Sequence, residues 1–310
     1  MKIFSGSSNR VLSEKVAKEM DLELSSVDMH VFPDGEKRIR IPESILDQDT
    51  VIIQSAATPV DQNYMELFFV IDALRRNGAK SVTAVVPYFG YQRQDHVFRD
   101  GEAVSLEVVI SMLESVKVDR LVTFDLHSVK IPDLFHIPVS HLSALPAFVQ
   151  QVKENKWNTK DTVLVSPDIG GLRGIKKFSA LLGNMDYVVL KKRRDLATGA
   201  VSSEDIMEGS LKNKKRAILL DDMISSGSTI IVAAEVLQQH GIKDIAVFAT
   251  HPVFSVNAPF ILQNSILSHV FVSDTVRISS AKRFEKLTIV SVAKEVSREL
   301  TRMLTANKRE

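Results

Sequence analysis

Short apolar runs alternate with helix-like segments along almost the whole 310-residue chain, and no other feature of the sequence constrains the fold as strongly. Most runs are apolar at consecutive positions, which is typical of parallel strands covered by helices on both faces of a sheet. The clearest runs are residues 51–56, 81–89, 120–127, 162–167, 186–192, 216–222, 244–252 and 268–274. Helix-like patterns between them include residues 63–79 and 102–116. The alternation predicts an α/β fold with doubly wound parallel sheets.

The length of the chain predicts about two domains, at roughly 150 residues for each. A more polar stretch over residues 146–160 suggests the boundary, so we predict domains at 1–145 and 146–310. Expected strands and helices alternate in a similar way in the two parts, but no clear sequence repeat relates them. Residues 191–215 are polar and contain glycines, which indicates a mobile loop or a small hairpin.

Composition excludes several classes of protein. The net charge of +1 gives no reason to expect a nucleic acid or a membrane surface as a partner. The absence of cysteine excludes disulfides, thiolate nucleophiles and cysteine-ligated zinc. No apolar stretch approaches the ~20 residues that cross a bilayer, and the first residues lack the apolar segment of a secretory signal. We therefore expect a soluble, cytoplasmic protein.

Polar residues follow the apolar runs, where ligands bind in folds of this kind. The segment 216–241 is the clearest case: Asp221 and Asp222 end an apolar run, residues 225–229 are small donors, and a helical pattern follows. Backbone N–H groups and hydroxyls at a helix start can surround an anion, and no lysine follows Gly227 as a Walker loop would require. Paired carboxylates can accept the two hydrogen bonds of a sugar diol. A sugar phosphate satisfies both halves of the motif.

A simpler interpretation is that the two aspartates only precede a helix capped by Ser225 or Ser226. Two charges at the end of a buried strand are costly without a partner, which favours a ligand.

The segment LLDDMISSGST resembles the phosphoribosyl-diphosphate signature that type I phosphoribosyltransferases share with ribose-phosphate diphosphokinases. Most of the remaining chain resembles the diphosphokinases, through KIFSGSSNR, FPDGEKRIRIPES, IIQSAATPVDQNYMELFFVIDALRRNGAKSVTAVVPYFGYQRQD, TFDLHS, VSPDIGGLRGIKKF and LKKRRD. The resemblance implies two similar doubly wound parallel-sheet domains of the type I phosphoribosyltransferase kind. It also implies transfer of the diphosphoryl group of MgATP to the 1-hydroxyl of ribose 5-phosphate, giving phosphoribosyl diphosphate and AMP.

The resemblance assigns roles to individual residues. Ribose 5-phosphate is expected at Asp221, Asp222, Ser225, Ser226, Gly227, Ser228 and Thr229. ATP is expected at Phe32, Asp34, Glu36, Arg93, Gln94 and Asp95. The expected Mg²⁺-linked residues are His127 and Asp168, and the expected catalytic residues are Lys192 and Arg194. Without the resemblance, these segments are ordinary features: a turn at 32–36, a solvated loop at 93–95, a structural histidine and a solvated basic face.

In the family, the segment matching 32–36 serves the active site of a neighbouring subunit. The resemblance therefore implies self-association, as a dimer or a hexamer with a shared ATP site.

The sequence also departs from the family pattern. The loop is Ser225-Ser226-Gly227-Ser228-Thr229 where the commonest family loop is Asp-Thr-Gly-Gly-Thr, and a serine at the fourth position would be strained if φ there had to be positive. Leu46-Asp47 and Asp100-Gly101 stand where the phosphate-activated class carries basic residues. We therefore predict weak or absent control by phosphate and ADP.

Two alternative functions stay open. One is a phosphoribosyltransferase that consumes phosphoribosyl diphosphate. The other is a catalytically weak or silent regulatory homologue, which the altered loop favours and the intact lysine, arginine, histidine and aspartate positions oppose.

Overall fold

The computed structural model describes residues 1–194, 201–255 and 257–307 and divides the chain into two compact units. Unit 1 comprises Met1–Ser143, Thr275–Arg277 and Ser291–Glu310, and unit 2 comprises Ala144–Asp274 and Ile278–Val290. The first boundary lies within two residues of the predicted one. The structure differs from the prediction in placing 275–277 and 291–310 with the first unit, because the last helix packs against the first helix of the chain.

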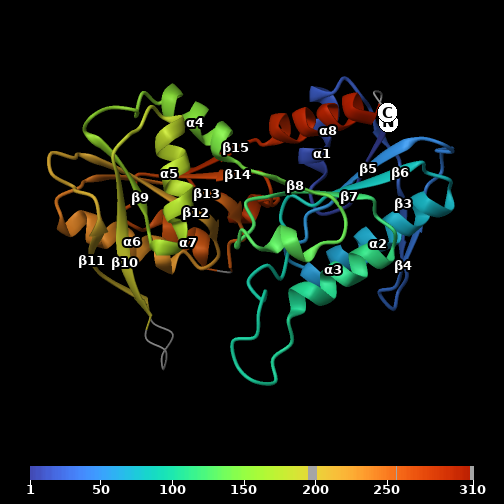
Figure 1. The fold of residues 1–310 in the computed structure, drawn as a ribbon, viewed down its shortest axis with the longest axis horizontal. Coiled ribbons are helices and arrows are strands. Elements are labelled where there is room, and N and C mark those ends of the chain that lie inside the picture. Colours follow the sequence, from blue (N-terminus) through green and yellow to red (C-terminus); the bar gives the residue numbers. More distant parts are fainter. Residues whose placement is uncertain (195–200, 256, 308–310) are drawn as a thin grey trace. The chain divides into compact units, whose positions relative to one another are not determined.

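Unit 1 is built on a parallel sheet covered on both faces (Figure 1). The strand order is β2 (Leu24–Ser25), β1 (Lys2–Ser5), β5 (Asp49–Ile53), β6 (Ser81–Val85), β7 (Arg120–Phe124) and β8 (Val139–Leu142). Helices α1 (Arg10–Glu19) and α8 (Ala293–Asn307) lie on one face, and α2 (Val60–Arg76) and α3 (Ser105–Ser115) lie on the other. Strands β3 (Asp28–Val31) and β4 (Lys37–Arg40) form a separate antiparallel hairpin.

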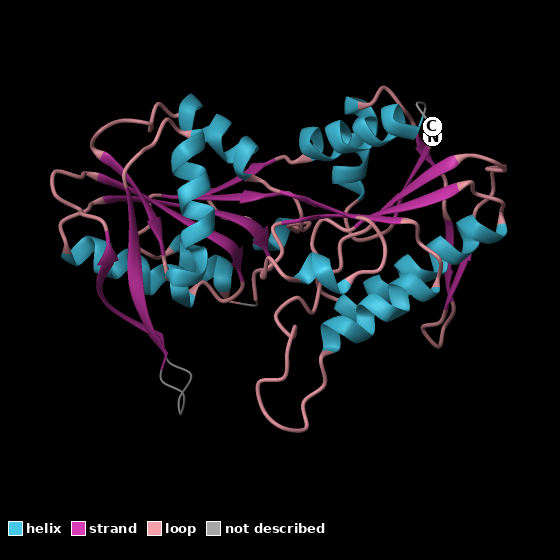
Figure 2. Ribbon diagram, viewed as in Figure 1, coloured by secondary structure: helices cyan, strands magenta, loops and turns pink. Residues whose placement is uncertain are grey.

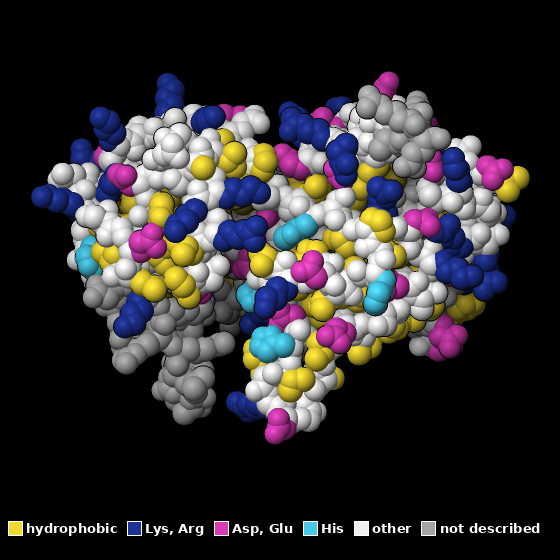
Figure 3. All heavy atoms as spheres, viewed as in Figure 1, with side chains coloured by type: hydrophobic (Ala, Val, Ile, Leu, Met, Phe, Trp, Pro, Cys, Tyr) yellow, Lys and Arg dark blue, Asp and Glu magenta, His cyan; other side chains and the backbone are white. Residues whose placement is uncertain are grey.

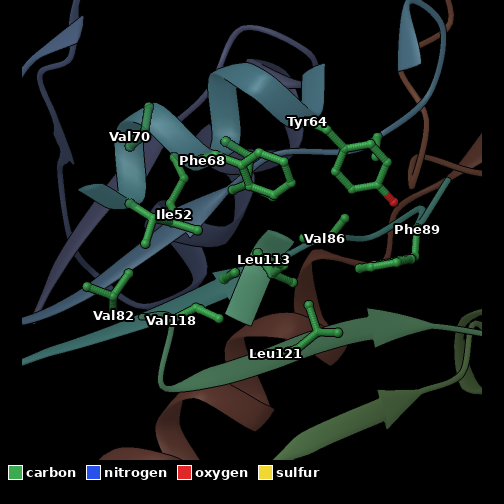
Figure 4. Close-up of a cluster of buried hydrophobic side chains, with 14 of the residues drawn as sticks. Ile52, Tyr64, Phe68, Val70, Val82, Val86, Phe89, Leu113, Val118 and Leu121 are labelled. Atoms are coloured by element: carbon green, nitrogen blue, oxygen red, sulfur yellow. The ribbon is translucent and has the colours of Figure 1, made fainter. Parts of the chain in front are cut away.

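The core of unit 1 lies between the sheet and helices α2 and α3 (Figure 4). Residues from α2 such as Tyr64 and Phe68 cluster with residues from the sheet such as Ile52 and Val82, and each of these residues is at most 5% exposed. Burying side chains of this size contributes about 1.5–3 kcal/mol each, before the entropic cost of ordering them. The apolar runs therefore form strands because both of their faces are buried.

Unit 2 is built on a second sheet (Figure 2). Its strand order is β11 (Val201–Glu208), β10 (Tyr187–Arg194), β9 (Thr162–Ser166), β12 (Arg216–Ile224), β13 (Asp244–Pro252), β14 (His269–Ser273) and β15 (Leu287–Val290). All neighbours are parallel except β10 and β11. Its helices are α4 (Leu145–Glu154), α5 (Leu172–Leu181), α6 (Ser228–Gln239) and α7 (Ala258–Gln263).

The two sheets repeat one topology. The order β2-β1-β5-β6-β7-β8 in unit 1 has the same connectivity as β10-β9-β12-β13-β14-β15 in unit 2. The predicted pair of similar doubly wound domains is therefore confirmed. In each sheet the second strand is added on one side of the first strand, and the later strands are added on the other side. Because the crossovers have one hand, α1 and α2 cover opposite faces of the unit 1 sheet, and α5 and α6 cover opposite faces of the unit 2 sheet. The switch points lie between β1 and β5 and between β9 and β12, where ligands of such sheets bind.

The predicted elements are mostly found. Each of the eight apolar runs contains a strand. The polar stretch 146–160 is not a linker, because most of it is α4, whose Phe148 and Val152 are fully buried. The two described ends of the 191–215 segment form a hairpin, with Lys192 opposite Ser203. Among the described residues, no helix is both long and apolar enough to cross a membrane.

Candidate active site

The loop that follows β12 turns the chain sharply into α6. Gly227 caps the helix at φ 84°, a left-handed conformation that glycine adopts at little cost. Ser228 is the first residue of α6 and does not have a positive φ, so the strain expected there is not present. The hydroxyls of Ser226 and Ser228 lie 3.0 Å apart, and the first turn of α6 contains no acidic residue. The loop therefore places small donors at a positively polarised helix end.

Three carboxylates lie at or just beyond the ends of two neighbouring strands. Asp221 and Asp222 belong to the last part of β12, and Asp168 follows the end of β9. The Asp168 Oδ1 atom accepts hydrogen bonds from Gly170 N at 2.9 Å and Gly171 N at 3.3 Å, which fixes the start of the following helical turn. The parallel pairing of β9 with β12 brings these side chains to one edge of the sheet, at the switch point.

Asp221 is held where its charged form is disfavoured. Burial raises its pKa well above the ordinary value of 3.8, and the negative charges of Asp222 and Asp168 raise the pKa further. The Asp222 amide opposes this effect by donating to Asp221 Oδ1 at 2.9 Å. A ligand that donates hydrogen bonds or carries positive charge would relieve the repulsion among these carboxylates.

The expected catalytic residues lie on β10, next to β9. The backbones of Lys192 and Arg194 pair with Ser203 and Val201 on β11. Their side chains lie outside the described residues, so their expected roles stay predictions.

The turn between β3 and β4 presents the first expected ATP residues. Phe32 N donates to Glu36 O at 2.8 Å, and Glu36 N donates to Asp34 Oδ1 at 3.1 Å. Phe32, Asp34 and Glu36 are all exposed. The guanidinium of Arg38 lies 5.8 Å from the centre of the Phe32 ring, and His30 meets that ring edge-on. The turn therefore offers an aromatic face with carboxylates close by in the chain.

The second group of expected ATP residues follows β6. Arg93 and Gln94 are exposed, and Asp95 is half-buried with its Oδ1 2.7 Å from His96 Nδ1. The loop is closed by Leu106 N, which donates to Gln94 O at 3.2 Å. Beyond it, apolar and histidine side chains gather on the exposed part of this loop (Figure 3), where Phe98 is 57% exposed.

Gln92 joins this loop to His127, and the sequence assigned it no role. Its side chain is fully buried, and its Oε1 accepts a hydrogen bond from His127 N at 2.8 Å. Its Nε2 is buried without a hydrogen-bond partner among the described residues. The only sequence signal is its place directly before Arg93, and glutamine in a polar loop is normally exposed.

The structure brings several of the expected residues together. Asp168, Asp221 and Asp222 meet at the edge of the unit 2 sheet, and the loop at Arg93 is tied to His127 in unit 1. Within unit 1, Lys37 beside the 32–36 turn contacts Glu66 of α2, and Tyr91 before the 93–95 loop contacts Asp61 of the same helix.

Comparisons with known proteins cover nearly the whole chain. Family models match for the N-terminal domain of ribose phosphate pyrophosphokinase (residues 1–116), the phosphoribosyl transferase domain (140–255) and the phosphoribosyl synthetase-associated domain (208–308). Ribose-phosphate pyrophosphokinase of Fusobacterium nucleatum is 35% identical, covering 94% of this chain and 91% of the relative. The corresponding protein of Vibrio cholerae is 36% identical, covering 97% and 96%. Among solved structures, phosphoribosylpyrophosphate synthetase from Mycobacterium smegmatis matches with a TM-score of 0.89 and 33% identity, covering 98% and 99%.

Proposed function

Because the chain belongs to the ribose-phosphate pyrophosphokinase family, we propose that it transfers the diphosphoryl group of MgATP to the 1-hydroxyl of ribose 5-phosphate. The products are phosphoribosyl diphosphate and AMP. The observation that carries this proposal is the likeness over nearly the full length of both units, including the models for the N-terminal and synthetase-associated domains. A phosphoribosyltransferase accounts only for residues 140–255.

We assign ribose 5-phosphate to the carboxyl end of β12. The hydroxyls and N–H groups of Ser225–Thr229 would hold the 5-phosphate at the start of α6, where the helix dipole favours negative charge. Asp221 and Asp222 would accept hydrogen bonds from the ribose hydroxyls. The raised pKa of Asp221 supports this assignment, because hydrogen-bond donors supplied by a ligand would stabilise its ionised form.

We assign ATP to the two exposed segments of unit 1. Phe32 would stack on adenine, with Asp34 and Glu36 as acceptors, while Arg93, Gln94 and Asp95 would contact the nucleotide and its phosphates. As the family resemblance implies, a second copy of the chain would supply the 32–36 turn. The protein would then work as a dimer or a hexamer with a shared ATP site.

A mixing experiment tests the shared site. The variants Phe32→Ala and Arg93→Ala should each lose most activity alone. Mixed after exchange of subunits, they should regain part of it, because some interfaces would combine two intact segments. Failure of any mixture to regain activity, with subunit exchange verified by mass, would contradict the shared site.

The donor set near β9 and β12 suits Mg²⁺. Magnesium prefers oxygen ligands and keeps waters and substrate phosphates in its shell. Asp168 offers a carboxylate, and no cluster of three or more His, Cys, Asp or Glu side chains arranged for a metal is found among the described residues. Asp168 would contact an ion that arrives with ATP, directly or through water, and the family resemblance gives His127 a Mg²⁺-linked role as well. Bound there, Mg²⁺ would neutralise charge on the transferred phosphates.

The chain's own residues would then position the reactants. Lys192 and Arg194 would donate to oxygens of the transferred group as charge develops there, and the ribose-binding loop would aim the 1-hydroxyl in line with the β-phosphorus. As the 1-oxygen forms its bond to the β-phosphorus, the bond between the β-phosphorus and the oxygen retained by AMP breaks, and the hydroxyl proton passes to solvent. No covalent intermediate with the protein is needed.

One assay tests the proposed function. The protein is incubated with ribose 5-phosphate, ATP and Mg²⁺, and AMP and phosphoribosyl diphosphate are measured, with a reaction lacking ribose 5-phosphate as the control. We expect equal amounts of both products. AMP formation that requires an added homologue would indicate a regulatory protein, and consumption of phosphoribosyl diphosphate with a nucleobase would indicate a phosphoribosyltransferase. A cytoplasmic location stays a prediction from the sequence.

A further inference from the structure

The switch point of unit 1 is filled by the protein's own side chains. It lies between β1 and β5, which correspond by topology to β9 and β12 of unit 2. The loop after β1 contains Ser7 and Ser8, and Gln54 follows β5. Glu66 of α2 enters among them and is 0% exposed. A carboxylate of the chain therefore occupies the place where a doubly wound sheet usually binds a ligand.

Among the described residues, the hydrogen-bond partners of Glu66 are all donors. Its Oε1 accepts from Ser7 N at 2.6 Å and from Gln54 Nε2 at 3.1 Å. Its Oε2 accepts from Ser7 Oγ at 2.8 Å and from Lys37 Nζ at 2.7 Å. An ionised carboxylate only accepts hydrogen bonds, so it fits this set, whereas an amide would direct its NH₂ group at another donor.

The surrounding groups hold this carboxylate firmly in place. Gln54 Oε1 accepts from Ser8 N at 3.0 Å, and its Nε2 also lies 3.3 Å from Asn63 O. Gly6 allows the close approach, because a Cβ atom there would lie 2.2 Å from Gln54 Oε1. Glu66 is therefore an anchor fixed by two loop segments and by its own helix.

Lys37 connects this anchor to the hairpin. It is the first residue of β4 and directly follows Glu36 of the turn assigned to ATP. Its side chain is 18% exposed, and along β4 the half-buried residues Lys37 and Ile39 alternate with the exposed Arg38 and Arg40. The hairpin pairs with neither large sheet, so side-chain contacts must hold it against unit 1.

We propose that Glu66 is a positioning residue for the nucleotide. Through Lys37 it fixes the start of β4, and with it the orientation of the Phe32–Glu36 turn. The inference rests on the proposed function, since it takes this turn as part of an ATP site. It adds a role for a buried ion pair that does not itself touch the nucleotide.

The test compares two charge-removing substitutions on one strand. Lys37→Met removes the inward cation and leaves Glu66 without its ion pair. Arg40→Met removes an outward, exposed cation whose nearest atom is 4.0 Å from Asp28, and is the matched control. We expect Lys37→Met to raise the KM for ATP about 10- to 100-fold, as displacement of a binding group by about 1 Å can do. The KM for ribose 5-phosphate should stay near the wild-type value, and Arg40→Met should change neither constant.

Two further variants at the same position still test the proposal if Lys37→Met folds poorly. Lys37→Arg retains the cation and should restore most of the ATP affinity, while Lys37→Gln retains a donor without charge and should give an intermediate KM. In Lys37→Met and Lys37→Gln, amide hydrogen exchange should accelerate in residues 32–36 more than in β5 or β6.

Several outcomes would overturn the proposal. Equal effects of Lys37→Met and Arg40→Met on the KM for ATP would do so, as would a parallel rise of both KM values with a general loss of thermal stability. If the wild-type protein makes no phosphoribosyl diphosphate, the proposed function fails. Hydrogen exchange then still decides separately whether the ion pair fixes the turn.

Discussion

Asp221→Asn should make the protein more stable at neutral pH while impairing its activity. Burial and the charges of Asp222 and Asp168 raise the pKa of Asp221 well above 3.8, so ionising this group costs free energy in the folded state. Each unit of a raised pKa corresponds to about 1.4 kcal/mol. Asparagine is neutral, nearly isosteric and still able to accept from the Asp222 amide. We therefore expect the free energy of unfolding to rise by at least about 1 kcal/mol, or about 2–4 °C in the Tm.

The pH dependence fixes the sign of this prediction. Well below pH 3.8, Asp221 is protonated in both the folded and the unfolded wild-type protein, so the two proteins should have similar stability. As the pH rises, the unfolded chain loses its proton first, and wild-type stability falls until the pH passes the raised pKa of the folded state. The gain in Tm of Asp221→Asn should therefore be small at pH 4 and widen towards pH 8.

The activity should change in the opposite direction. Losing a hydrogen bond to a charged group costs about 1.5–3 kcal/mol, which corresponds to a KM for ribose 5-phosphate about 10- to 150-fold higher. Thermal unfolding from pH 4 to pH 8 and steady-state kinetics at one pH supply both measurements. A variant that is less stable than wild type at pH 8, or a Tm difference independent of pH, would refute the claim that the folded state disfavours the ionised form of Asp221.

Asp161→Asn is the matched control with the opposite sign. The hydroxyl of Thr159 donates to Asp161 and lowers its pKa, and the nearby charges of Lys215 and Arg216 act in the same direction. The stabilising effect is present above the ordinary pKa of 3.8 and is lost as the pH falls through the folded value. Asp161→Asn should therefore be slightly less stable than wild type at pH 8, with the difference vanishing on acidification and no change in KM.

The remaining predictions concern the loop, the basic strand and regulation. Gly227→Ala should lower the free energy of unfolding by about 1–2 kcal/mol because the φ of Gly227 is 84°. Gly241→Ala is the control and should cost a similar amount, since Gly241 has φ 86° and open space around the added methyl group. A KM for ribose 5-phosphate that rises only in Gly227→Ala would separate an effect on binding from an effect on stability. Lys192→Ala should lower kcat about 10²–10³-fold, whereas Lys191→Ala should change it little, and equal losses would contradict the assignment. Titration with inorganic phosphate and ADP should alter the rate little, and an obligatory requirement for phosphate would show that a second anion site exists despite Leu46 and Asp47.

The sequence by itself determined the fold class, and it was enough to predict where the main site lies. Strands that are buried on both faces need consecutive apolar residues, and this pattern depends only on neighbours in the chain. For the same reason, the pair Asp221-Asp222 and the loop around Gly227 were recognisable, because a strand end, a turn and a helix start follow one another within a few residues.

Other features were decided only by the tertiary structure. The apolar stripe of α8 predicts that one face of the helix is buried, but it does not say against which element. That α8 packs against α1 depends on which apolar surface of unit 1 is left uncovered once the sheet has formed. Glu66 lies in an amphipathic pattern where a glutamate is normally solvated, and its burial follows from donors on three segments far apart in the chain. Likewise, the effect of Asp168 on the pKa of Asp221 requires β9 and β12 to be neighbours. Strand order is set by many weak contacts across the whole unit, and no single segment carries that information.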